Sequence, residues 1–80
     1  MSIYDPKYSI KGYDTYFQNP CYPFIFADTA EQAKEKAISY YEDYLTPDNQ
    51  IELQIYKRNY DGGLDLIGVV DAYGDYEDIF

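Results

Sequence analysis

The chain contains no histidine and only one cysteine in 80 residues. Histidine is the commonest general base of enzymes and a frequent metal ligand, so its absence removes the usual basis of both chemistries. A Cys–His or Ser–His nucleophile therefore cannot form within one chain. Because Cys21 stands alone, an internal disulfide and a four-cysteine zinc site are also excluded. We predict a protein that is not an enzyme and that has no catalytic residues, no cofactor and no metal site.

Basic residues are scarce. Six lysines and arginines stand against fifteen acidic residues, and the net charge is −9. Nucleic acid and anionic lipid bind through lysine and arginine, so direct binding to either is not expected. Residues 42–80 hold ten acids and two bases, a net charge of −8, whereas residues 1–41 carry −1. We expect the partner to be a basic protein surface that the second half of the chain contacts.

Long apolar runs are absent as well. No stretch approaches the ~20 apolar residues that a membrane-spanning helix needs. The first residues, MSIYDPKYSIKG, lack a basic region followed by an apolar run, so a signal peptide is not expected. A lone cysteine agrees with a reducing compartment. The prediction is a cytoplasmic protein.

Aromatic residues, in contrast, are abundant. Twelve tyrosines and four phenylalanines belong to an apolar fraction of 46%. A disordered chain would be poor in aromatic residues, so this chain is expected to fold. Its length corresponds to a single domain, residues 1–80, which buries about 60 to 65% of the surface of the unfolded chain.

One helix is predicted within DTAEQAKEKAISYYEDYLTPD, residues 28–48. Either Asp28 with Glu31 or Thr29 with Gln32 has the spacing of residues that start a helix. Pro47 ends it, because a residue that precedes proline is pushed out of the helical region. The apolar residues recur at helical spacing and form one stripe: Ala30, Ala33, Ala37, Ile38, Tyr41, Tyr44 and Leu45.

The remaining patterns favour strands. IELQIYKR, residues 51–58, alternates as a half-buried strand does, and the Asp-Gly of NYDGG indicates a hairpin turn to residues 64–73. PFIFA, residues 23–27, is a strand that enters the helix, and the segment before it is a strand or a loose hairpin with a loop at YDTYFQNPCYP. The fold class is α+β: a single helix on a three- to four-stranded, mostly antiparallel sheet, β-α-β-β with or without an extra N-terminal strand. A right-handed crossover would place the strand at 64–73 between the strand at 23–27 and the strand at 51–58.

The segment DAYGDYEDIF, residues 71–80, combines carboxylates with tyrosines. If the chain stays extended, Asp71, Tyr73, Asp75 and Glu77 share one face, with neighbouring positions ~6.7 Å apart. A DNA strand carries one charge per ~3.4 Å, so such a row approximates a phosphate track. Tyrosines are common interface anchors. An alternative interpretation is that the acids only keep the protein soluble. The predicted partner-binding residues are Asp71, Tyr73, Asp75, Tyr76, Glu77 and Asp78, supported by Asp65, Glu42 and Asp43.

The stretch FIFADTAEQAKEKAISYYEDY, residues 24–44, resembles a pattern of small phage-encoded anti-CRISPR and anti-defence proteins: a strand, a capping residue, then alanines three and four apart. The resemblance implies inhibition by binding, with an acidic surface in the DNA site of a nuclease, and it carries over no functional residue. We therefore expect a non-enzymatic inhibitor, a possible nucleic-acid mimic, that binds a basic nucleic-acid-binding surface of a host defence nuclease such as a CRISPR effector. The alternative is a structural or regulatory interaction module, a homodimer that pairs through a strand edge or through the tyrosines.

Overall fold

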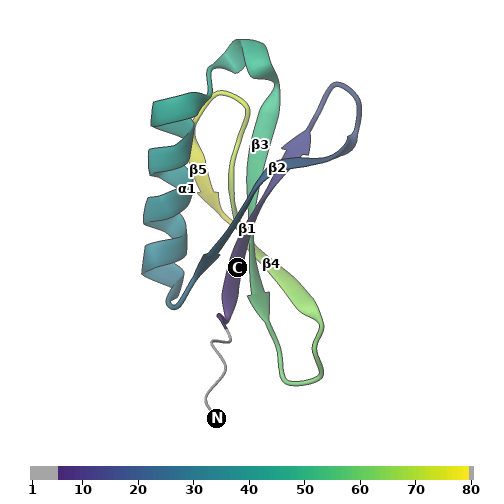
Figure 1. Ribbon diagram of the computed structural model, residues 1–80, viewed down its shortest axis with the longest axis vertical. Coiled ribbons are helices and arrows are strands. Elements are labelled where there is room, and N and C mark those ends of the chain that lie inside the picture. Colours follow the sequence, from purple (N-terminus) through teal and green to yellow (C-terminus); the bar gives the residue numbers. More distant parts are fainter. Residues whose placement is uncertain (1–5, 80) are drawn as a thin grey trace.

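The computed structural model describes residues 6–79 and consists of one α-helix packed on a five-stranded antiparallel sheet (Figure 1). The predicted class, a helix on a mostly antiparallel sheet, is confirmed, and the sheet has one strand more than the expected maximum. The elements, in chain order, are β1 (Tyr8–Asp14), β2 (Asn19–Ala27), α1 (Ala30–Tyr44), the 3₁₀ turn η1 (Pro47–Asn49), β3 (Ile51–Arg58), β4 (Leu64–Val70) and β5 (Tyr76–Asp78).

The strand order is β2-β1-β3-β4-β5, and every neighbouring pair is antiparallel. The predicted position of the strand at 64–73 is therefore wrong. It was expected next to the strand that enters the helix, but β1 takes that place and β4 lies between β3 and β5. The physical reason is the hairpin formed by β1 and β2, which covers the edge of β2 that a crossover would otherwise use.

The β1–β2 hairpin is tighter than its composition suggests. Only residues 15–18 form the turn, so most of YDTYFQNPCYP is strand. Pro20 and Pro23 are accommodated because β2 is an edge strand, where a missing N–H can face solvent. A bulge between Lys11 and Gly12 shifts the register of the pair.

The helix begins as the second of the two predicted starts requires. The hydroxyl of Thr29 accepts a hydrogen bond of 3.1 Å from the N–H of Gln32, which caps the first turn. The Gln32 side chain in turn accepts one from the N–H of Asp28. The helix ends at Tyr44, three residues before Pro47, as predicted.

The core lies between α1 and one face of the sheet. Ala33 and Ala37 are fully buried, and their small side chains let the helix approach the strands closely. Ile10, Leu53, Ile55 and Val70 fill the sheet side, and burial of each such side chain contributes about 1.5–3 kcal/mol. The helix contacts β1, β2, β3 and β4 on this face. Within residues 6–79 there is no second α-helix to cover the opposite face, which we call the open face.

Candidate binding surface at the acidic end

Carboxylates and exposed aromatic rings gather at one end of the 43 Å long axis. Four segments lie at this end: the last turn of α1, η1, the β1–β2 turn and the turn between β4 and β5 (Figure 1). We call this region the acidic end. It comprises the carboxylates Asp14, Glu42, Asp43, Asp48, Asp71 and Asp75 and the exposed rings Tyr16, Phe17, Tyr44 and Tyr73.

Residues 71–75 form a tight turn, so the predicted extended row of acids is wrong. The N–H of Asp71 donates to the carbonyl of Asp75 at 2.9 Å. The Asp71 carboxylate accepts from the N–H of Tyr73 at 2.9 Å and from that of Asp75 at 3.0 Å. Hydrogen bonds of this kind fold the backbone back on itself. Asp71 is therefore largely a turn-forming residue, whereas Tyr73 and Asp75 point to solvent from a fixed position.

The helix holds this turn in place through Tyr41. The Tyr41 hydroxyl donates a hydrogen bond of 2.7 Å to the carbonyl of Ala72, and its ring lies against Gly74. Gly74 has φ +91°, and a Cβ there would lie only 2.6 Å from the Tyr41 ring. Burial raises the pKa of the Tyr41 hydroxyl, and the charges of Asp71 and Asp75 raise it further. Tyr41 therefore places the last helical turn, which contains Glu42 and Asp43, next to this turn.

The β1–β2 turn is fixed to η1 in a similar way. The N–H and the hydroxyl of Thr15 both donate to the carbonyl of Gln50, at 2.8 and 2.7 Å. The Asp14 carboxylate accepts from the N–H groups of Tyr16 and Phe17 at 2.9 and 3.0 Å. Those two rings pack edge to face, with centroids 4.8 Å apart, and remain exposed. The turn therefore presents a preorganised aromatic pair.

The sequence analysis missed the contribution of this turn. Asp14, Tyr16 and Phe17 belong to the first half of the chain, which is nearly neutral, and they were assigned to a loop. The signal that could have identified them is Asp-Thr-Tyr-Phe, an aspartate placed to accept hydrogen bonds from the residues that follow it, between two strand-like segments. Only the pairing of β1 with β3 brings this turn close to η1.

Four of the predicted binding residues lie outside the acidic end. Glu77 is on β5 opposite Val69, and Asp65 is near the other end of β4, opposite Lys57. Tyr76 packs against the core, with its hydroxyl bonded to the Asp78 carboxylate at 2.5 Å. Burial, then the hydrogen bond and charge of Asp78, raise the pKa of Tyr76 to about 12. Tyr76 thus helps to attach β5 to the core, and the Asp78 carboxylate holds the Tyr76 hydroxyl within that strand.

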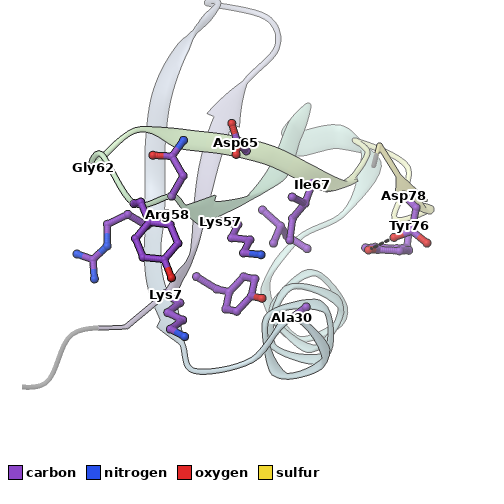
Figure 2. A pocket seen from close by; sticks show the side chains of 13 residues that line it. Lys7, Ala30, Lys57, Arg58, Gly62, Asp65, Ile67, Tyr76 and Asp78 are labelled. Atoms are coloured by element: carbon purple, nitrogen blue, oxygen red, sulfur yellow. Dashed lines mark hydrogen bonds between the residues drawn. The ribbon is translucent and has the colours of Figure 1, made fainter.

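The opposite end of the molecule carries a basic group of residues. A pocket of about 1030 Å³ lies there, next to the first turn of α1 and the β3–β4 turn (Figure 2). Lys7, Lys57 and Arg58 line it, and they are three of the six basic residues of the chain. No lysine or arginine occurs in residues 12–33, 37–56 or 59–80, which supply the acidic end. Lysine and arginine are therefore absent from the segments of the acidic end, whereas acids occur at both ends, since Asp65 and Asp78 line the same pocket as the three basic residues.

Three further features of the described residues concern a reactive thiol, a metal site and a membrane-spanning helix. Burial raises the pKa of the Cys21 thiol, and the nearby Asp14 carboxylate raises it further, so the thiolate is disfavoured. No group of three or more cysteine, aspartate or glutamate side chains within residues 6–79 is placed to hold a metal ion. In the same range, no helix is long and apolar enough to cross a membrane.

Comparison of the chain with protein-family models, with curated proteins and with solved structures found no match.

Proposed function

We propose that this protein is a non-enzymatic inhibitor whose acidic end binds a basic, nucleic-acid-binding surface of another protein. The resemblance of residues 24–44 to anti-CRISPR proteins makes a host defence nuclease, such as a CRISPR effector, the first target class to test. In this proposal a phage or other mobile element encodes the protein, which acts in the cytoplasm of the host cell.

The observation that carries the proposal is a group of carboxylates and exposed aromatic rings at one end, in segments without lysine or arginine. Six carboxylates and four exposed rings from four segments lie at one end, and the segments that supply them contain no basic residue. Complementary charge accelerates association with a basic surface, while desolvated aromatic side chains slow dissociation. Two of the four segments are fixed by hydrogen bonds to their neighbours, so little ordering is needed on binding.

The acids do not form a linear phosphate track, because residues 71–75 turn back. The proposed competition with nucleic acid therefore rests on shared electrostatic preference and on occupation of the same surface. It does not rest on matching the phosphate spacing.

A capture experiment with matched variants tests the proposal. The acidic-end variant is Asp43→Asn/Asp75→Asn, which removes two exposed charges. The control is Asp61→Asn/Asp65→Asn, which removes exposed charge near the other end. Wild type and control should retain the same nucleic-acid-binding protein from host lysate, and the acidic-end variant should not.

The retained protein should then be released by added duplex DNA or RNA and by raised salt. A stable ternary complex of target, nucleic acid and this protein would contradict the proposed mode of inhibition. Equal retention of the target by both variants would show that the acidic end is not the contact.

A further inference from the structure

The open face of the sheet is more aromatic than a solvated face requires. Phe24 and Phe26 of β2 are 54% and 44% exposed and pack edge to face with centroids 4.9 Å apart. The ladder places Ser9 beside Phe26 on one side and Tyr56 on the other. Exposed apolar patches bordered by polar groups mark interaction sites on soluble proteins.

The polar groups of this face are ordered. The Tyr56 hydroxyl donates to the Gln54 side chain at 2.6 Å, and the Gln54 amide donates to the Glu52 carboxylate at 2.8 Å. The Lys11 ammonium lies 5.9 Å from the ring centroids of both Phe24 and Tyr56. The aromatic rings of this face therefore surround the Lys11 ammonium, and hydrogen bonds hold the Tyr56 and Gln54 side chains in position.

One row of residues crosses all five strands on this face. The ladder pairs give the order Phe24, Lys11, Gln54, Val69, Glu77, from β2 to β5. The row therefore has a cation near one edge, an acid at the other edge and an amide in the middle. A pattern of this kind is self-complementary under a twofold rotation.

We propose that two copies of this chain associate through their open faces, about a twofold axis parallel to β3 and midway between the two sheets. This rotation reverses the order of the row in the second copy. Gln54 then faces its equivalent, and Phe24 faces the edge that carries Glu77. Lys11 is then offset along the row by about one strand spacing, ~4.8 Å, from the Glu77 position of the other copy. With sheets packed ~10 Å apart, the two backbone positions are about 11 Å apart, a distance that the lysine and glutamate side chains can span together.

The charges of this row favour this axis over the perpendicular one, whereas Glu52, two residues along β3 on the same face, then faces its equivalent in the second copy. An axis along the row would leave its order unchanged and place Lys11 against Lys11 and Glu77 against Glu77. With the axis parallel to β3, each lysine approaches an acid of the partner, and the two aromatic edges of the sheets are covered. The net charge of −9 on each copy opposes association, so the dimer is best measured at physiological ionic strength, where the Debye length is about 8 Å.

Sedimentation equilibrium over a wide concentration range tests the proposal. The wild-type protein should form a reversible dimer. Phe24→Ser/Phe26→Ser should raise the dimer dissociation constant about tenfold or more, since truncated interface anchors typically have effects of this size. The matched control, Tyr60→Ser, removes a fully exposed ring from the β3–β4 turn and should dimerise as wild type does.

A charge exchange tests the axis independently of the phenylalanines. Lys11→Glu and Glu77→Lys should each weaken the dimer, and the double variant Lys11→Glu/Glu77→Lys should restore it. Melting temperatures verify that each variant is folded. A wild-type protein that is monomeric at all concentrations, a dimer insensitive to loss of both phenylalanines, or a double variant no better than the single ones would overturn the proposal.

Discussion

Two turns in the second half of the chain are close in composition and differ in what they touch. Residues 59–63 join β3 to β4 and residues 71–75 join β4 to β5. Each contains a tyrosine, an aspartate and a glycine with positive φ, +86° at Gly62 and +91° at Gly74. A Cβ at Gly62 would meet no atom within 4 Å, whereas one at Gly74 would overlap the Tyr41 ring.

The difference lies in tertiary contact. The β3–β4 turn is held by its own hydrogen bonds, such as the 3.2 Å bond from the Gly62 N–H to the Asn59 carbonyl. The β4–β5 turn has local bonds of the same kind and is also fixed to the helix by Tyr41. Local sequence therefore specifies that each segment turns, and the helix determines which turn is rigid enough to serve as part of a binding surface.

The largest expected contrast is between Gly74→Ala and Gly62→Ala. At Gly74, alanine meets a left-handed conformation that costs about 1–2 kcal/mol, and overlap with Tyr41 adds about 1–3 kcal/mol. At Gly62 only the cost of the left-handed conformation applies, because a Cβ there meets no atom within 4 Å. Urea unfolding should therefore show a loss of roughly 2–5 kcal/mol for Gly74→Ala and about 1–2 kcal/mol for Gly62→Ala. Equal losses would mean that Tyr41 does not pack against the turn.

The second contrast is between Asp71→Ala and Asp61→Ala. The Asp71 carboxylate accepts two backbone hydrogen bonds of 2.9 and 3.0 Å, whereas Asp61 accepts one of 3.4 Å. We expect Asp71→Ala to lower the free energy of unfolding by about 1–3 kcal/mol and Asp61→Ala by about 0.5 kcal/mol or less. The same unfolding curves decide it, and a larger effect at Asp61 would contradict the assignment of Asp71 to turn formation.

The third test removes the link between helix and turn. Tyr41→Phe deletes the hydroxyl that donates to Ala72 and should lower the free energy of unfolding by about 0.5–1.5 kcal/mol at neutral pH. The raised pKa of Tyr41 means that folding favours its protonated form. This stabilisation is fully present below the ordinary pKa of about 10 and is lost as pH rises through the folded-state value. The difference between wild type and Tyr41→Phe should therefore shrink above about pH 10. A difference that stays constant would show that the hydroxyl is not linked to folding.

The smallest expected effect on stability is at the exposed tyrosines. Tyr73 is 76% exposed and Tyr60 fully so, and replacement of either by alanine should change the free energy of unfolding by less than about 0.5 kcal/mol. If the proposed function is correct, the two substitutions should differ in their effect on the dissociation rate of the target complex. Tyr73→Ala should raise the dissociation rate of the target complex about tenfold, and Tyr60→Ala should leave it unchanged. The reverse result would place the contact at the opposite end.

Much of the fold could be predicted because its signals are local. The alanine spacing and Pro47 gave the helix, and alternation gave β3 with its bounds as observed, Ile51–Arg58. The position of β1 could not be read from the chain, because pairing with β3 depends on segments far apart in sequence. The bulge in β4, opposite Ile55 and Tyr56 of β3, could not be predicted from the sequence either. It places Ile67 against the core, although strict alternation would put it on the same face as Val69.

The candidate site was also predicted only in part, because some of its residues are identified by composition and others are brought in by long-range strand pairing. Acidic composition identified Glu42, Asp43 and residues 71–75, which the structure brings to one end. Extended geometry for residues 71–77 was wrong, because Asp71 bonds to the backbone of its own turn. Asp14 could not be added, since only the β1–β3 ladder brings its turn close to η1.

The position of the first strand inside the sheet, between β2 and β3, also determines when the sheet can form during synthesis. β1 pairs with β3 from Asp14↔Ile51 to Tyr8↔Lys57. A nascent chain can therefore form the β1–β2 hairpin and α1 early, but the middle of the sheet must wait until β3 leaves the ribosome. Closing the chain between Asp14 and Ile51 then has an entropic cost on the order of 3 kcal/mol, which only the assembled core offsets. Until β3 is made, the apolar side chains of β1 and α1 lack the core partners that Leu53 and Ile55 supply in the folded protein.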